Sequence, residues 1–394
     1  MDALQFTLSR IGKVETHPHI VYIYRYDFSL IPRILSGFVK NPICIVFPKS
    51  IEDVLRILEI AERYETPVVP RGAATSAYGG CIPLKRCIVV DFKLMSNFSF
   101  YDNAAIVESG AIWMDIEREA KKIGKALRVY PTSANVSTVG GWIAQGGYGV
   151  GSLKYGGIIE NIDWIEVADF GGVRRVEGDG LKYYVGCFGT TGLIVRACIK
   201  LREDLPIFCK TLECDFGEAM AKVEGYHAVF KDERLMAFEG FEAKNTLLLC
   251  SENGKDCTNL GKKMWEKRLM PLKAVSAGKH IFSEVVVPKE KAELFYLEAK
   301  KISEGIEAVF SREEIVFIGY FGGGYRNMLR TLKFVKVAEK FDGRVYATGM
   351  LFPHKFNKDL RDYKKRVDPK NLLNPGKSTA NVFSRILRVA EKFL

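Results

Sequence analysis

Glycine and small hydroxyl residues are concentrated in residues 131–156, which read PTSANVSTVGGWIAQGGYGVGSLKYG. Seven of these 26 residues are glycine, and Lys154 carries the only charge. Glycine costs backbone entropy, so this density indicates that the main chain approaches a ligand or takes positive φ angles. A flexible linker is the alternative, but linkers rarely carry residues such as Trp142, Ile143 and Tyr155 between their glycines. The stretch therefore predicts a ligand-binding segment.

Two further segments of small residues, 71–80 and 186–195, lie in the same β-rich N-terminal part of the chain. In the first of them, every position from 72 to 77 is small. Successive backbone N–H groups in such a turn can form a concave nest for an anion, with the Thr75 and Ser76 hydroxyls as further donors. A tight hairpin loop is the alternative. The three segments together predict one large ligand.

Common nucleotide-binding and hydrolase motifs are absent from the sequence. There is no GxxxxGK[ST], and no GxGxxG opens a helix, which excludes a P-loop and a Rossmann site. The GxSxG motif of serine hydrolases is also absent. With these motifs excluded, the ligand must still reach three separated loops, and it must be anionic in one part and flat or apolar in another. A dinucleotide in another fold meets these demands. FAD is the candidate, with its pyrophosphate at 72–76 and its ring against 140–149.

Four motifs, in this order along the chain, resemble those of a known family. They are PVVPRGAATSAYGG, the 131–156 stretch, GCFGTTGLI and DPKNLLNPGK. On these motifs the chain resembles the vanillyl-alcohol oxidase/p-cresol methylhydroxylase superfamily of FAD enzymes. Within it, the chain is similar to the branch of D-lactate dehydrogenases and the flavin subunit of glycolate oxidase. The resemblance implies an α+β fold. It has a two-subdomain FAD-binding domain of the p-cresol methylhydroxylase type (1–205), an antiparallel-sheet α+β cap domain (206–345) and a C-terminal segment (346–394) that returns to the flavin site.

The resemblance also implies which residues contact FAD. The first loop would hold the pyrophosphate, residues 131–156 would line the cofactor, the third segment would approach the adenosine, and one residue of the tail would close over the ring. Several relatives attach flavin through a histidine of the first loop; this loop has none, so non-covalent FAD is expected. The implied residues are Arg71, Gly72, Ala73, Ala74, Thr75, Ser76, Tyr78, Gly79, Pro131, Thr132, Thr138, Gly140, Gly141, Ala144, Gly147, Gly149, Ser152, Tyr155, Gly192, Ile194, Val195 and Asn374.

The cap domain departs from the pattern of the 2-hydroxyacid branch. Relatives there carry GHxGDGNxH and a later Glu-His pair, which hold a divalent metal. The matching stretch, 319–327, reads GYFGGGYRN, and the later pair falls on Ala347 and Thr348. Neither part retains an imidazole or a carboxylate, so no metal is expected at this site.

Three residues are candidates for catalysis. His354 lies in the segment expected to return to the flavin, which makes it the candidate base. Arg326 could pair with a substrate carboxylate, and Tyr320 could line the pocket. A solvated arginine and a packed tyrosine are the alternatives. The remaining histidines are interpreted as a surface pair (His17 and His19), a structural residue in a helix (His227) and the first residue of a strand (His280).

Hydrophobic periodicity predicts the elements that position these residues. In the FAD-binding domain, strands are expected at IVYIY (20–24), PICIVFP (42–48), 67–70, CIVVDF (87–92), 104–110, on both sides of a turn at 169–172, and at 193–201. Helices are expected at 51–64, behind a Ser50 capping box, and from Trp113 to Leu127. After Pro206, the expected strands are 209–215, 234–241, 245–251, 281–287 and 315–321, and the expected helices are 216–230, 258–270, 289–303 and 325–341.

Composition limits the partners and the compartment. Nine cysteines without a CxxC pair argue against an iron–sulfur cluster, a structural zinc or a disulfide framework in this chain, and favour the cytoplasm. A net charge of +11 favours an anionic small-molecule substrate or an acidic protein partner, and it leaves peripheral contact with a membrane open. No basic run is interleaved with aromatic residues, so nucleic acid is not expected. No apolar run is long enough for a transmembrane helix. Having only two glutamines points to a thermophilic source.

The resulting hypothesis is an FAD-linked dehydrogenase or oxidase that acts on CH–OH groups. It would move a hydride from a hydroxylated substrate, a 2-hydroxyacid in the first instance, to flavin N5, and electrons would pass to a quinone or protein acceptor. One alternative is the flavin subunit of a larger redox complex with an iron–sulfur or other electron-transfer subunit. The others are a non-redox flavoenzyme of the alkyl-dihydroxyacetone-phosphate synthase type and a non-catalytic flavin-binding protein.

Overall fold

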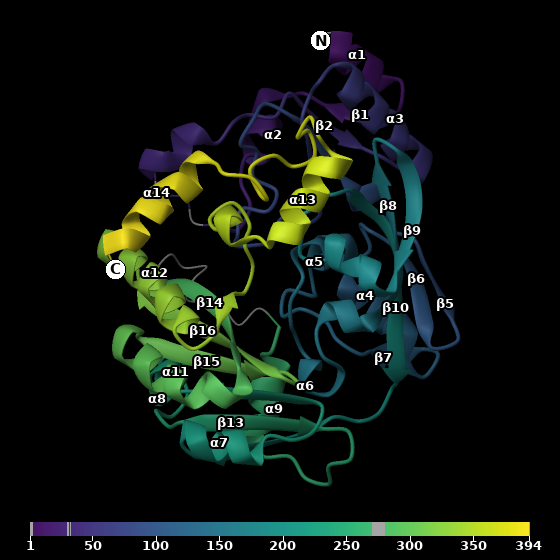
Figure 1. Cartoon of the computed structure of the whole chain (residues 1–394). Coiled ribbons are helices and arrows are strands. Elements are labelled where there is room, and N and C mark those ends of the chain that lie inside the picture. The colour runs from purple at the N-terminus through teal and green to yellow at the C-terminus, as the bar shows by residue number, and fades with distance from the viewer. Residues whose placement is uncertain (1–2, 30, 32, 270–279, 394) are drawn as a thin grey trace.

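The chain folds around three β-sheets, as the computed structural model shows for residues 3–29, 31, 33–269 and 280–393. Figure 1 places a seven-stranded sheet with its helices at the bottom and the N-terminal sheets above it and to the right. The C-terminal segment, in yellow, lies along the top and left. The predicted α+β class, with an antiparallel sheet in the second half of the chain, is confirmed. We propose domain boundaries at 205/206 and 345/346, because β10 ends at Glu203 and β17 ends at Val345.

The first sheet has four strands in the order β1-β2-β4-β3. β2 (Cys44–Phe47), β4 (Ile88–Asp91) and β3 (Val68–Arg71) are parallel, and β1 (Lys13–Glu15) is antiparallel to β2. Parallel strands need a crossover, which α3 (Ile51–Arg63) supplies between β2 and β3. The remaining elements of this part are α1 (Ala3–Ser9), α2 (Pro18–Ile23) and the 3-10 turns Arg33–Phe38 and Phe92–Leu94.

Helix α3 begins where the sequence predicts. The Ser50 side chain accepts a hydrogen bond from the backbone N–H of Asp53 at 3.2 Å, which satisfies one of the free donors of the first turn. A Ser50→Ala variant is expected to lose about 1 kcal/mol of unfolding free energy in urea titrations. The control is Glu59→Ala on the same helix, which removes only an exposed ion pair with Arg63 and is expected to cost about 0.5 kcal/mol or less. An equal loss in both variants would contradict the capping account.

The second sheet is antiparallel throughout and follows the order β5-β6-β10-β8-β9, with β7 added to the end of β10. Its core includes Trp113 and Trp142, whose rings meet edge to face at 5.2 Å. The elements are β5 (Phe98–Tyr101), β6 (Ala104–Glu108), α4 (Trp113–Lys121), β7 (Lys125–Leu127), α5 (Val139–Gln145), α6 (Ser152–Tyr155), β8 (Ile162–Asp169), β9 (Gly172–Glu177) and β10 (Leu193–Glu203), with 3-10 turns Ile158–Asn161 and Gly178–Tyr183.

The third sheet has seven antiparallel strands in the order β11-β13-β12-β15-β16-β14-β17. Aromatic residues of α7, α11 and α12, such as Phe216, Phe295 and Phe334, cover one face and form the largest core of this part. The elements are β11 (Phe208–Glu213), α7 (Phe216–Lys222), β12 (His227–Lys231), α8 (Glu233–Phe238), β13 (Thr246–Ser251), α9 (Asn259–Glu266), β14 (His280–Pro288), α11 (Lys289–Ile302), β15 (Gly305–Phe310), β16 (Glu314–Gly322), α12 (Tyr325–Glu339) and β17 (Arg344–Val345).

Two predictions in the FAD-binding domain are wrong. The IVYIY segment (20–24) is expected to be a strand, but it belongs to helix α2, where Pro18 occupies the first turn with a preset φ angle. The helix expected from Trp113 to Leu127 ends at Lys121. Gly124 then takes a φ of +72°, which reverses the chain and places Leu127 in strand β7.

The two wrong predictions in the cap domain concern adjacent segments. The helix expected over 216–230 stops at Lys222, Gly225 turns the chain with a φ of +97°, and 227–231 forms strand β12. The strand expected over 234–241 is instead helix α8, whose first turn is capped by Asp232 accepting from Leu235 N at 2.9 Å. Strand β15 has no counterpart among the predicted elements.

The C-terminal segment packs back onto the N-terminal half. Its buried Lys364 donates to the carbonyl oxygens of Thr190 at 2.8 Å and Leu373 at 2.7 Å, and it pairs with Asp368. Val68 N donates to Leu372 O, which joins the tail to strand β3. The elements of this segment are α13 (Lys358–Val367), α14 (Val382–Ala390) and the 3-10 turns Pro353–Lys355 and Glu391–Phe393.

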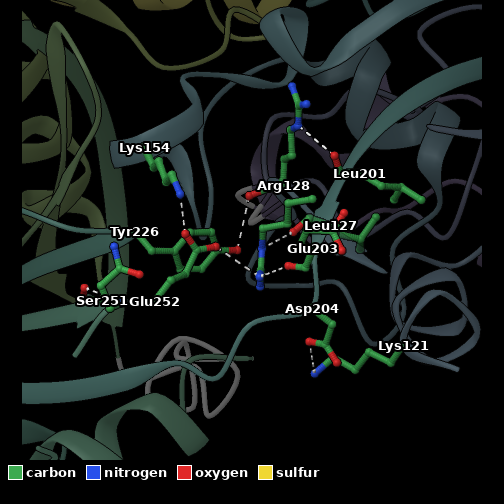
Figure 2. Close-up of polar contacts among 12 residues, drawn as sticks. Lys121, Leu127, Arg128, Lys154, Leu201, Glu203, Asp204, Tyr226, Ser251 and Glu252 are labelled. Carbon is green, nitrogen blue, oxygen red and sulfur yellow. Dashed lines mark hydrogen bonds and ion pairs between the residues drawn. The ribbon is translucent and has the colours of Figure 1, made fainter. Parts of the chain in front are cut away.

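A buried ion pair joins the second and third sheets. Arg202 at the end of β10 lies 3.2 Å from Glu252, which follows β13, and only 7% and 5% of their side chains are exposed. The Arg202 guanidinium also lies over the Tyr226 ring and donates to Leu127 O. Figure 2 shows Glu252 and Tyr226 with Lys154, which pairs with the same carboxylate. These contacts therefore join the second sheet to the third.

Candidate functional site

One cavity of about 640 Å³ joins the three small-residue segments to the seven-stranded sheet. Its walls come from the first loop (71–80), the glycine segment (131–156) and the third segment (186–195). The face of the seven-stranded sheet opposite α7, α11 and α12 forms another wall, which we call the sheet face. Its side chains alternate along the strands, as with His227, Val229 and Lys231 of β12. The volume is typical of small-molecule and cofactor sites.

The first loop follows β3 and presents its backbone to the cavity. Ala74 has a φ of +58°, a conformation that non-glycine residues rarely adopt. No described residue accepts a hydrogen bond from the N–H groups of Ala73 to Ala77, so these donors are available to a ligand. Arg71 is fixed by its own contacts, donating to Tyr26 O at 2.9 Å and lying over the Tyr24 ring. The loop therefore has the form of an anion nest.

The glycine segment faces the first loop through helix α5, which is part of the segment. Thr138 caps this helix by accepting from Gly141 N at 3.2 Å. A Cβ on Gly141 would lie 4.0 Å from the Cα of Gly72 and 2.8 Å from Thr138 Oγ1, so a larger side chain would project into the cavity. Gly149 is different: its Cβ would meet Tyr130 O at 2.2 Å. Its glycine is thus required by packing within the protein.

Most of the expected cofactor residues line this cavity, and a minority do not. Gly79, Gly147, Ser152, Tyr155, Gly192, Val195 and Asn374 lie outside its wall. The residues that line it are Arg71, Gly72, Ala73, Ala74, Thr75, Ser76, Tyr78, Pro131, Thr132, Thr138, Gly140, Gly141, Ala144, Gly149 and Ile194.

Several of the residues outside the wall support it from behind. Asn374 donates to Gly80 O at 2.8 Å and to Phe188 O at 2.7 Å, which ties the first loop to the third segment. Ser152 accepts from Gly149 N at 2.9 Å within the glycine segment. Asn374, the tail residue expected to close over the ring, thus connects two of the three loops.

The three catalytic candidates separate in the structure. Tyr320 lines the cavity, and its hydroxyl donates to Glu307 at 3.4 Å. His354 does not line the cavity; its Nε2 lies 3.3 Å from the carboxylate of Glu391 near the C-terminus. Burial lowers the pKa of His354 despite that carboxylate. Arg326 lies in the first turn of α12, and its side chain is outside the described part of the structure. The structure therefore offers no support for His354 as the base.

The sheet face carries polar residues that sequence reasoning missed. Lys231 and Glu307 stand opposite each other on β12 and β15, 3.8 Å apart, and Lys231 also pairs with Glu239 at 2.5 Å. Glu284 of β14 and His227 of β12 line the same face. The sequence signal that could have identified them is a charged residue inside an otherwise apolar run, such as Glu284 in IFSEVVVP. Because of the wrong helix over 216–230, His227 was interpreted as a structural helix residue and not as part of a strand.

Burial shifts the pKa of these groups. It raises the pKa of Glu307, and it raises the pKa of Glu284 to about 8, with the charge of Glu307 as the second cause. It lowers the pKa of His227 to about 3, and nearby Arg268 adds to this effect. Burial would also lower the pKa of Lys231, but Glu307 and Glu239 outweigh it and hold that pKa above its ordinary value. Near neutral pH, Glu284 is therefore mainly protonated and His227 is neutral.

Unpartnered polar atoms in the cavity wall fit a polar ligand. Among the described residues, the buried Tyr78 OH, Ser137 Oγ and His227 Nδ1 have no hydrogen-bond partner. Such orphaned groups are rare in proteins unless a ligand or water satisfies them. Within the described part of the chain, no three His, Cys, Asp or Glu side chains gather as metal ligands. The free backbone donors, the glycine approach at Gly141 and the orphaned hydroxyls together fit FAD.

Comparison with known proteins agrees with this cofactor. Residues 42–176 match the family model of the FAD binding domain. The glycolate oxidase subunit GlcD of Bacillus subtilis (strain 168) is 31% identical over 192 residues, which cover 45% of this chain and 40% of that protein. A D-lactate dehydrogenase of Archaeoglobus fulgidus is 26% identical over 426 residues, covering 90% of this chain and 95% of the relative. The chain thus spans less than half the length of the first relative.

Solved structures share the whole fold. An alkyldihydroxyacetonephosphate synthase superposes with a TM-score of 0.72 at 17% identity, covering 92% of this chain and 82% of that one. A p-cresol methylhydroxylase with substrate bound gives a TM-score of 0.72 at 14% identity, covering 95% and 96% of the two chains.

These likenesses define the class: the chain is an FAD-binding protein with the fold of the vanillyl-alcohol oxidase/p-cresol methylhydroxylase superfamily. Within that class, its sequence relatives include a D-lactate dehydrogenase and a glycolate oxidase subunit, as the motifs indicate. Among the described residues, no helix is long and apolar enough to cross a bilayer.

Proposed function

We propose that the chain oxidises a hydroxylated small molecule at non-covalently bound FAD. The observation that carries this proposal is that one continuous cavity connects the FAD segments with a polar sheet face. In it, the N–H groups of Ala73–Ala77 would bind the pyrophosphate, and the backbone of 140–149 would face the flavin ring. Bound FAD supplies a two-electron acceptor. The sheet face would then position the substrate and handle its hydroxyl proton.

The substrate class that we propose first is a 2-hydroxyacid, because relatives are named for lactate, glycolate and 2-hydroxyglutarate. Two cationic residues of the cavity wall, Lys267 and Arg268, are available to attract a carboxylate. Arg268 is held by Tyr130 OH at 3.0 Å and by contact with the Trp265 ring. Lys267 and Arg268 directly follow α9 and so lie at that end of the cavity, whereas the carboxyl groups of the sheet face lie on the strands.

The electron acceptor is proposed to be a quinone or a protein, and one such partner would be a further subunit with an iron–sulfur centre. The relative named as a subunit supports the latter arrangement. A second candidate function is the non-redox chemistry of the alkyl-dihydroxyacetone-phosphate synthase type. It is favoured by the shared fold and by the same two cations, which suit a phosphate equally well. We propose the cytoplasm, with or without peripheral membrane contact, as the compartment.

Anaerobic mixing of the FAD-loaded protein with D-lactate, glycolate and D-2-hydroxyglutarate tests the function. At least one donor is expected to bleach the oxidised flavin absorbance, because hydride transfer reduces the ring. Dithionite reduction is the positive control for bound flavin. The 2-hydroxyacid assignment is contradicted if dithionite bleaches the flavin and none of the donors does. The second candidate function predicts flavin that stays oxidised with 2-hydroxyacids but binds a phosphorylated ligand.

A further inference from the structure

Glu284 differs from the other carboxyl groups of the sheet face. Glu239 and Glu307 both contact Lys231, and Glu307 also accepts from Tyr320. No described residue donates a hydrogen bond to the Glu284 carboxyl or forms an ion pair with it. Glu284 lines the cavity, and the residue paired with it on the neighbouring strand β16 is the apolar Ile318. Glu284 is thus a carboxyl group that faces the cavity with no partner among the residues that the structure describes.

The position of Glu284 brings it close to the glycine segment. Tyr346 N donates to the main-chain oxygen of Glu284 at 3.1 Å. The hydroxyl of the same Tyr346 donates to Tyr148 O at 2.9 Å and accepts from Tyr148 N at 3.0 Å. One tyrosine therefore links Glu284 to the part of the glycine segment proposed to face the flavin ring. Tyr148, Glu284 and Tyr346 all line the cavity.

Compared with the titratable groups near it, Glu284 is the one best able to accept a proton from a substrate. The charge of Glu307 on β15 raises the pKa of Glu284, and the charge of Glu284 in turn raises the pKa of Tyr320 on β16 and of Tyr346 after β17. Helices α11 and α12 cover the opposite face of β14, where Phe295 and Phe334 pack in the core. Burial raises the pKa of both tyrosines, which keeps them protonated, and Glu307 is occupied by Lys231 and Tyr320.

We propose that Glu284 is the catalytic base that takes the hydroxyl proton of the substrate. In this step the substrate O–H bond breaks and its proton passes to the Glu284 carboxylate. The C–H bond breaks with its electron pair, which leaves as a hydride to the bound FAD as the two-electron acceptor, and a C=O bond forms. The assignment rests on the proposed dehydrogenase function.

The test compares Glu284→Gln with Glu284→Asp and with Glu290→Gln, an exposed carboxyl at the start of α11. Three quantities are measured: FAD affinity, the rate of anaerobic flavin reduction against pH, and the thermal unfolding midpoint against pH. For the wild type and Glu290→Gln, we expect the reduction rate to rise with pH and to level off above about pH 8, where Glu284 becomes ionised. Glu284→Gln is expected to bind FAD normally and to lose about 100-fold or more in rate, together with the pH dependence. Glu284→Asp should recover part of the rate.

The unfolding series gives a readout without catalysis. Because burial raises the pKa of Glu284 in the folded state, its stabilising effect is complete below the ordinary glutamate pKa and is lost as the pH rises through about 8. The Glu284→Gln protein should therefore gain in unfolding midpoint relative to wild type as the pH rises from about 5 to about 8.

Each result decides between distinct conclusions. Reduction of Glu284→Gln at the wild-type rate, with the wild-type pH profile, would overturn the role of Glu284 and leave the dehydrogenase function standing. Loss of FAD binding in both the Gln and Asp variants would show a structural role and would also overturn the proposal. A wild-type protein that no donor reduces would instead remove the proposed function itself, and the base with it.

Discussion

A Gly141→Leu variant is expected to lose about 100-fold in FAD affinity and to displace the Thr138 hydroxyl, which lies 2.8 Å from where its Cβ would be. Gly141 lies in α5 with its α-carbon open to the cavity, and the facing backbone of Gly72 is only 4.0 Å from where a Cβ would be. A leucine would therefore occupy the space between the first loop and the glycine segment, which we assign to the cofactor. Steric overlap of this kind typically costs about 1–3 kcal/mol. Fluorescence titration of the apoprotein with FAD measures the loss.

The matched control is Gly37→Leu. A Cβ on Gly37 has no neighbour within 4 Å, and the residue does not line the cavity. This variant should keep the wild-type FAD affinity and unfolding midpoint. Gly149 is a poor choice for the experiment, because a Cβ there would meet the main-chain oxygen of Tyr130 and disturb the fold. If Gly141→Leu retained full affinity, the flavin would not lie between these two segments.

An Arg202→Met variant is expected to lose about 3 kcal/mol of unfolding free energy, because it leaves the buried Glu252 with Lys154 as its remaining cation. Arg202 also satisfies Leu127 O and Glu203 O, and it packs over Tyr226. Of these contacts, those with Glu252 and Tyr226 join the second sheet to the third. Urea titration followed by circular dichroism measures the change.

Lys200→Met on the same strand is the control, because its ion pair with Asp163 is partly exposed and should contribute less than about 1 kcal/mol. The double variant Arg202→Met with Glu252→Met should recover much of the loss, since no buried charge is then left unpaired. A double variant as unstable as the sum of the two single variants would contradict this explanation.

The cofactor half of the site could be predicted because its signals are local. Small residues at each position from 72 to 77 and the glycines of 131–156 are visible in the sequence, and both segments line the cavity. Sequence did not distinguish glycines whose α-carbon is open to the cavity, such as Gly141, from those required by packing, such as Gly149. That difference depends on Tyr130, which is distant in sequence but adjacent in space.

The substrate half could not be predicted, because it is assembled from strands that are separated in sequence. Lys231 and Glu307 are 76 positions apart in number (307 − 231), yet they face each other across β12 and β15. Short apolar runs do not separate strand from helix by periodicity, which explains the errors at 20–24 and 234–241. His354 was chosen for its place in the tail, but that tail instead directs it toward Glu391.

The most direct test of the central claim is the stoichiometry of FAD binding to the apoprotein by isothermal titration calorimetry, followed by acid precipitation. We expect one FAD per chain, all of it released into the supernatant, because we propose that the first loop and the glycine segment hold it through non-covalent contacts. The same titration with Gly141→Leu should show weakened binding. Absence of binding to the wild type, or flavin that stays with the precipitate, would contradict the account.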